Sequence, residues 1–139
     1  MRKFLLLIIT MFLIILLSAC TEGSGIPIKP NENNMIISIK NNTNFEFYGL
    51  GVRILDHSPT SVNADGSKIE KGESFMFELL EDDLDLNGNV KMEVAILSGK
   101  NNEEILLNNK ISLELNPNKE LFFELKGDSI EQAELKRDN

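Results

Sequence analysis

The sequence contains very few of the residues from which disulfides, metal sites and nucleophilic active sites are built. It has one cysteine, one histidine and no tryptophan among 139 residues. A single cysteine permits no intramolecular disulfide, and one cysteine and one histidine are too few nitrogen and sulfur ligands for a zinc site. Basic residues are also scarce, with 14 Lys and Arg against 22 Asp and Glu. Because an acidic surface repels phosphate backbones, we expect no nucleic-acid partner.

A hydrolase would have to be built on His57, the only histidine, which lies between Asp56 and Ser58. Adjacent side chains point apart, whereas a catalytic triad needs groups that converge from separate parts of a fold. No other pattern of nucleophile, base or metal ligands is evident in the chain. We therefore expect no enzyme, no catalytic residue and no organic cofactor.

The chain begins with a long apolar run. Arg2 and Lys3 precede the apolar residues 4–17, and the small residues Ser18 and Ala19 follow. This layout is typical of a secretory signal peptide. The rival interpretation, an uncleaved transmembrane anchor, needs about 20 apolar residues to cross the hydrocarbon core. The run is too short for that by about a quarter.

The segment closes on Leu17-Ser18-Ala19-Cys20, which resembles the lipobox of bacterial lipoproteins. The resemblance implies that the Cys20 thiol carries diacylglycerol and that the signal peptide is cut immediately before it. It also implies a location on the extracytoplasmic side of the cell membrane, held by the lipid. Whether the Cys20 amine is acylated as well is left open.

Cleavage before Cys20 would divide the chain into a signal peptide (residues 1–19), a lipidated cysteine with a flexible tether (residues 20–34) and a domain (residues 35–139). The 120 remaining residues suit one domain of ordinary size. They keep 12 basic and 22 acidic residues, a net charge of −10. We expect this acidic domain to stand off the anionic membrane surface.

From residue 35 onward, apolar residues recur at every second position between turn-forming residues, which predicts strands. Strands are expected at residues 35–40, 44–56, 74–80, 90–96, 104–107, 111–115 and 121–125. Residues 41 and 42 should break the first strand, and the second should bulge near Gly49. The loop at residues 56–73 leaves room for a short strand at 68–70. Residues 130–137 read as a last edge strand or, with Ser129 as cap, a short helix.

Seven or eight short strands without a helical period predict an all-β fold, an antiparallel immunoglobulin-like β-sandwich. A small barrel is the alternative. The most distinct connection joins residues 111–115 to residues 121–125 through a turn at Asn116-Pro117-Asn118-Lys119, which predicts a hairpin.

The sharpest candidate metal site is Asp83-Leu84-Asp85-Leu86-Asn87-Gly88, which matches the first half of an EF-hand calcium loop. Asp83, Asp85 and Asn87 would be the ligands. The match fails afterwards, because Val94 occupies the position of the bidentate glutamate. Further ligands would have to come from Glu81, Asp82 and the Asn89 carbonyl. The alternative is a charged, solvated turn, since Asn-Gly is itself a turn signal.

Two smaller features suggest contacts. Gly49 and Gly51 leave bare backbone on one side of their strand, where a partner strand or a ligand could approach; the alternative, which we favour, is a bulged or twisted strand. Met76 and Phe122 are expected to point outward, as candidates for an exposed apolar patch. The rest of the chain is similar to small uncharacterised lipoproteins of Gram-positive bacteria. We expect a non-enzymatic binding module with an envelope protein as partner; the alternatives are a calcium-dependent module or a structural spacer.

Overall fold

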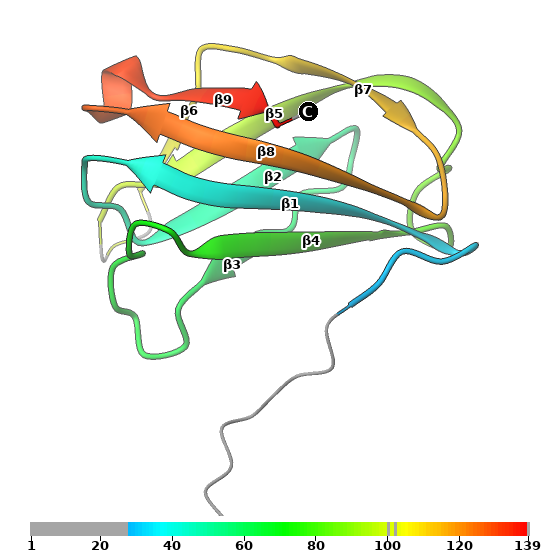
Figure 1. Ribbon diagram of the computed structural model, residues 1–139, viewed down its shortest axis with the longest axis horizontal. Coiled ribbons are helices and arrows are strands. Elements are labelled where there is room, and N and C mark those ends of the chain that lie inside the picture. The colour runs from blue at the N-terminus through cyan, green and yellow to red at the C-terminus, as the bar shows by residue number, and fades with distance from the viewer. Residues whose placement is uncertain (1–27, 100, 102, 139) are drawn as a thin grey trace, which may run out of the picture.

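The computed structural model describes residues 28–99, 101 and 103–138. These residues form two β-sheets packed face to face, with one turn of 3₁₀ helix (Figure 1). The strands are β1 (Asn34–Thr43), β2 (Gly49–Ile54), β3 (Thr60–Val62), β4 (Ser74–Leu80), β5 (Gly88–Leu97), β6 (Glu104–Leu106), β7 (Ile111–Leu115), β8 (Lys119–Gly127) and β9 (Glu134–Arg137).

The four-stranded sheet has the order β4-β1-β8-β9, and β8 lies between β1 and β9 in Figure 1. The five-stranded sheet has the order β3-β2-β5-β6. In that sheet β7 pairs with the first half of β5, and β6 pairs with its end. The predicted all-β fold with a β-sandwich architecture is therefore confirmed.

The core lies between the sheets and comes from the alternation that the sequence displays. Every second residue of β4 and β8 points inward and is buried, while most residues between them are exposed or half-buried. In β5 the same alternation holds at Met92, Val94 and Ile96, but Ala95 and Leu97 between and beyond them are buried as well. Burial of one such side chain stabilises the fold by about 1.5–3 kcal/mol. The inward residues of the three strands are Phe75, Phe77, Leu79, Met92, Val94, Ile96, Leu121, Phe123 and Leu125.

Two details of the predicted sandwich are wrong. The described residues contain nine strands rather than seven or eight. The sheets are also not wholly antiparallel, because β1 and β8 pair in parallel, with Met35 opposite Lys119 and Thr43 opposite Gly127. The first strand of the sheet thus lies beside a strand from the last part of the chain, a pairing that no local pattern reveals.

The predicted hairpin of residues 111–115 and 121–125 is wrong as well. Both segments are strands, but β7 pairs with β5 in one sheet while β8 pairs with β1 in the other. The turn between them crosses from sheet to sheet. Asn118 takes a positive φ of 60° there. Its N–H donates to the carbonyls of Asn31 (2.7 Å) and Asn34 (2.8 Å), so the turn is bound to the start of the domain.

The predicted strand at residues 44–56 begins only at Gly49, so the expected bulge is absent. Residues 44–48 are irregular because their backbone bonds to two separate segments. The Phe47 carbonyl accepts from the Ile69 N–H, and the Tyr48 N–H donates to the Leu97 carbonyl, at 2.8 Å each. Phe47 nevertheless reaches the core and is fully buried.

Three boundaries also differ from expectation. Asn41, expected to break β1, is a buried member of that strand. The short strand of the 56–73 loop is β3, at residues 60–62 rather than 68–70. Residues 130–137 contain both expected forms, a 3₁₀ turn at Ile130–Gln132 followed by the edge strand β9. Ser129 precedes that turn but makes no side-chain cap.

The expected signal peptide, Cys20 and most of the tether lie outside the described residues. At the described end of the tether, the Asn34 amide donates to the Lys29 carbonyl (3.2 Å), so the chain joins the domain a few residues before position 35. None of the helices in the described part of the chain has the length and apolar character needed to span a membrane.

Candidate functional site

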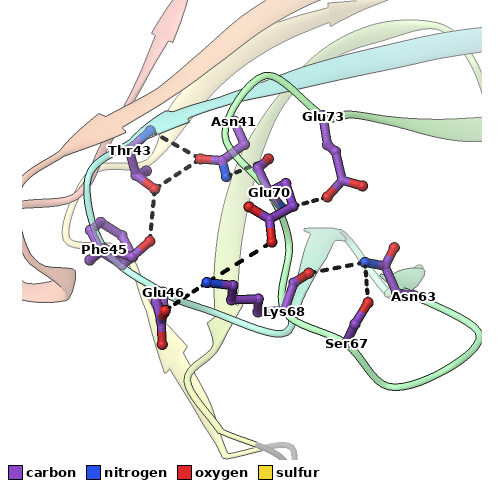
Figure 2. A network of polar contacts seen from close by, with 9 residues as sticks. All are labelled: Asn41, Thr43, Phe45, Glu46, Asn63, Ser67, Lys68, Glu70 and Glu73. Carbon is purple, nitrogen blue, oxygen red and sulfur yellow. Dashed lines mark hydrogen bonds and ion pairs between the residues drawn. The ribbon is translucent and has the colours of Figure 1, made fainter.

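The long loop at residues 56–73 borders a hollow of about 250 Å³, here called the loop hollow. Its walls come from the end of β1, from residues 44–46 and from residues 68–71. Figure 2 shows the polar contacts around it. These contacts bind the loop to the domain at several points.

Asn41 is the main attachment point of that loop. Its side-chain oxygen accepts from the N–H (3.0 Å) and the hydroxyl (2.8 Å) of Thr43, and its amide donates to the Glu70 carbonyl (3.1 Å). The Asn41 N–H also donates to the Glu73 carbonyl (2.8 Å). Asn41 and Thr43 are buried. Burial requires polar groups to be paired, so this network is structural.

Charged groups at the mouth of the loop hollow are paired with one another. Lys68 lies 2.8 Å from Glu46 and 4.0 Å from Glu70 (Figure 2). The Lys68 ammonium holds the pKa of the Glu46 carboxyl below its ordinary value through a hydrogen bond. The Glu46 carboxylate in turn raises the pKa of Lys68. Both groups are solvated, so the hollow holds a satisfied surface ion pair and no group is strongly activated.

The Asp83–Gly88 segment connects β4 to β5 and so crosses between the sheets. It is held by apolar side chains, because Leu86 is fully buried and Leu84 nearly so. The Asn87 amide donates to the Asp85 carboxylate at 2.9 Å. A calcium ligand would present the Asn87 oxygen instead. Among the described residues no group of three or more His, Cys, Asp or Glu side chains is arranged to hold a metal.

His57 lies in the tight turn after β2, where its N–H and carbonyl bond to those of Ile54 at 2.9 Å each. Leu55 takes a positive φ of 51° in this turn. Within the described part of the chain, no hydrogen bond joins the side chains of Asp56, His57 and Ser58. The three residues therefore do not form a triad.

The bare backbone at Gly49 and Gly51 faces other strands of the same sheet. A Cβ on Gly49 would lie 2.6 Å from Leu97 Cδ1 and 2.6 Å from Val62 Cγ1. A Cβ on Gly51 would lie 3.3 Å from Thr60 Oγ1. The space beside these glycines is filled by the neighbouring strands β3 and β5 of the same sheet.

Two exposed apolar side chains lie on the outer face of the four-stranded sheet. Met76 on β4 is 40% exposed and Phe122 on β8 is 52% exposed, both pointing outward as predicted. Ser38 on β1 lies between them in the register. These residues line a groove of about 300 Å³, here called the outer groove, together with Lys40, Ser74, Glu120, Phe123 and Asp138.

Polar residues at the outer groove were not singled out in the sequence. The Ser38 hydroxyl donates to the Glu120 carboxylate at 2.7 Å. The alternation of residues 35–40 does place Ser38 and Lys40 outward, but nothing local indicates that β8 is their neighbour. The groove has one apolar wall on each side of β1 and a polar floor, which suits an extended segment better than a small ligand.

No family model matches the chain, and no curated protein matches it. One solved structure, described as "NMR structure of the protein from Eubacterium rectale", aligns with 16% sequence identity and a TM-score of 0.47. The alignment covers 76% of this chain and 89% of that one. A likeness this distant carries no argument about function.

Proposed function

We propose that the protein is a lipid-anchored, extracytoplasmic lipoprotein of the cell membrane whose β-sandwich is a non-enzymatic binding module. The observation that carries the proposal is the sequence Leu17-Ser18-Ala19-Cys20 after a basic start and an apolar run. Cys20 is the only cysteine, so the thiol has no competing role in a disulfide.

The domain supports a binding role through its surface rather than through a catalytic centre. The outer groove offers exposed Met76 and Phe122 on a rigid sheet. Large exposed apolar side chains that lie together typically mark protein contact sites. The loop hollow is less suited, because its charged and buried polar groups already have partners within the domain.

We also propose that the sandwich is of the immunoglobulin-like type, because its two packed sheets are joined by connections that cross between them. The parallel β1–β8 pair departs from the antiparallel pattern expected for that type. Strand order therefore supports the assignment only as far as the two-sheet architecture.

The anchor is tested by comparing the full chain with Cys20→Ala in cells. We expect the native chain in the membrane fraction, cut before Cys20, with the mass of diacylglycerol on its first residue. Cys20→Ala should stay as an uncut precursor, while the adjacent control Thr21→Ala should be processed normally. Normal cutting and membrane retention of Cys20→Ala would overturn the anchor.

A further inference from the structure

We propose that β4 is an open sheet edge at which two copies of this chain pair, strand to strand, around a two-fold axis at Met76. The pairing rests on the proposed function in one respect, because anchoring on one membrane would concentrate the chains and favour their association. The hydrogen-bonding groups, side chains and charges of β4 favour it independently.

The register shows which backbone groups of β4 are unused. Asn41 donates to the Glu73 carbonyl, and Glu81 donates to the Asn33 carbonyl. Because bonding alternates along an antiparallel pair, the odd-numbered residues of β4 bond to β1. The N–H and carbonyl groups of Ser74, Met76 and Glu78 therefore point away from β1, as does the N–H of Leu80, whose carbonyl accepts from Asp83 and Leu84. Among the described residues, no backbone group bonds to Ser74, Met76 or Glu78 from outside the sheet.

The opposite edge of the same sheet is protected. β9 is only four residues long and carries Glu134, Lys136 and Arg137. The Asn109 amide covers it by donating to the Leu135 carbonyl at 3.1 Å. Short length, charge and covering groups are the usual protections of sheet edges. β4 has seven residues, one charge and exposed Met76 beside its open edge.

A second copy of β4 fits this edge in one antiparallel register. With Met76 opposite Met76 of the other copy, Ser74 lies opposite Glu78 in both halves of the pair. Ser74, Met76 and Glu78 then all pair, and each opposed pair can exchange two hydrogen bonds. A shift that places Ser74 opposite Leu80 would leave the Ser74 N–H facing the Leu80 carbonyl, which already accepts from Asp83 and Leu84. The register centred on Met76 also places no two like charges directly opposite each other, which would be destabilising.

The inner and outer faces agree with the same register. Within one chain, the rings of Phe75 and Phe77 are stacked with their centroids 6.5 Å apart. In the proposed pair, Phe75 of each copy would lie opposite Phe77 of the other copy. On the outer face the two exposed Met76 side chains would meet and extend the apolar wall of the outer groove. Aromatic and apolar pairs across strands stabilise sheets.

Charge at the two ends of β4 favours the antiparallel arrangement. Glu81, Asp82 and Asp83 follow the strand, whereas Glu70, Lys71 and Glu73 precede it, so the starting end is less acidic. Antiparallel pairing brings each strongly acidic end beside the less acidic end of the other copy. A parallel arrangement would bring two acidic ends together, at a cost in this acidic protein.

The proposal is tested by oxidative crosslinking of the full chain in intact cells. Met76→Cys should give a disulfide-linked dimer, because opposed residues in such a pair lie within disulfide reach. We expect at least tenfold more dimer than for Arg137→Cys on the opposite edge. Ser74→Cys chains mixed with Glu78→Cys chains should crosslink to each other, while neither variant crosslinks alone. The melting temperature of each variant shows that it is folded.

Two outcomes would overturn the pairing. One is equal crosslinking at positions 76 and 137, and the other is a product whose added mass is not one further copy of this chain. Repetition in the Cys20→Ala background separates this proposal from the anchor. Failure of the anchor alone leaves the position dependence of crosslinking intact, whereas a wrong register removes it in both backgrounds.

Discussion

The side-chain amide of Asn41 donates to the backbone carbonyl of Glu70 at 3.1 Å, so a residue inside β1 holds the far end of the longest loop. The oxygen of the same side chain accepts two hydrogen bonds from Thr43. Fixed in this way, the loop stays close to the end of β1.

Asn41→Ala should lower the free energy of unfolding by about 1–3 kcal/mol, because it removes the acceptor of the buried Thr43 N–H and the donor to the Glu70 carbonyl. Denaturant unfolding measures this loss. Asn42→Ala is the matched control, since Asn42 is the next residue and is less buried. Equal losses for the two variants would show that the Asn41 network has no special role.

Gly49→Ala should destabilise the five-stranded sheet by about 1–3 kcal/mol through overpacking. The added methyl group would meet Leu97, Val62 and the Ser61 carbonyl, all closer than 3.0 Å. Gly51→Ala, where the nearest atom is 3.3 Å away, should cost clearly less. The comparison uses thermal melts of both variants, and the reverse order would contradict the close approach of β3.

Leu86→Ala should cost about 2–5 kcal/mol, because Leu86 is fully buried and fastens the Asp83–Gly88 connection to the core. Asp85→Asn should change stability little, since that side chain is exposed. Melts in EDTA and in millimolar calcium should coincide for the native chain. A calcium-dependent rise in melting temperature that Asp85→Asn abolishes would instead support the metal site.

The pKa of Glu46 should rise toward its ordinary value in Lys68→Met, as measured by NMR titration of the side-chain carboxyl. In the native chain this pKa is lowered, so the pair stabilises the fold above the pKa of unfolded glutamate. The contribution is lost as pH falls through the lowered value. Lys71→Met is the control, because Lys71 donates to Asn44 instead. An unchanged Glu46 pKa in Lys68→Met would contradict the pairing.

Alternation along the chain predicts most strands and inner faces of the sandwich. Phe75, Phe77 and Leu79 are buried as their spacing indicates, and so are Met92, Val94 and Ile96. Turn residues mark the ends of strands, but they do not say which sheet the next strand enters. The crossing at Asn118 depends on bonds to Asn31 and Asn34, which lie far away in sequence. For this reason the local pattern of residues 111–125 indicates a hairpin, although the turn in fact connects strands of different sheets.

At the outer groove too, the sequence predicts which side chains face outward but not which strands are neighbours. The outward positions of Met76 and Phe122 follow from period two, and both are exposed. Their arrangement on either side of β1 depends on β1 pairing with β4 and β8, which no local signal specifies. Asn41 was expected to end a strand because asparagine favours turns. Its side chain is satisfied within the fold by Thr43 and Glu70, and so the strand continues.

The parallel β1–β8 pair has a consequence for the time order of folding. Ser38 and its partner Glu120 are 82 residues apart, so the four-stranded sheet cannot close until nearly the whole chain is available. Contacts of such long range slow folding, because a large loop must be ordered first. If the chain is exported across the membrane as proposed above, late closure of this sheet would keep the domain unfolded during passage. The four-stranded sheet would then form only after β8 has paired with β1.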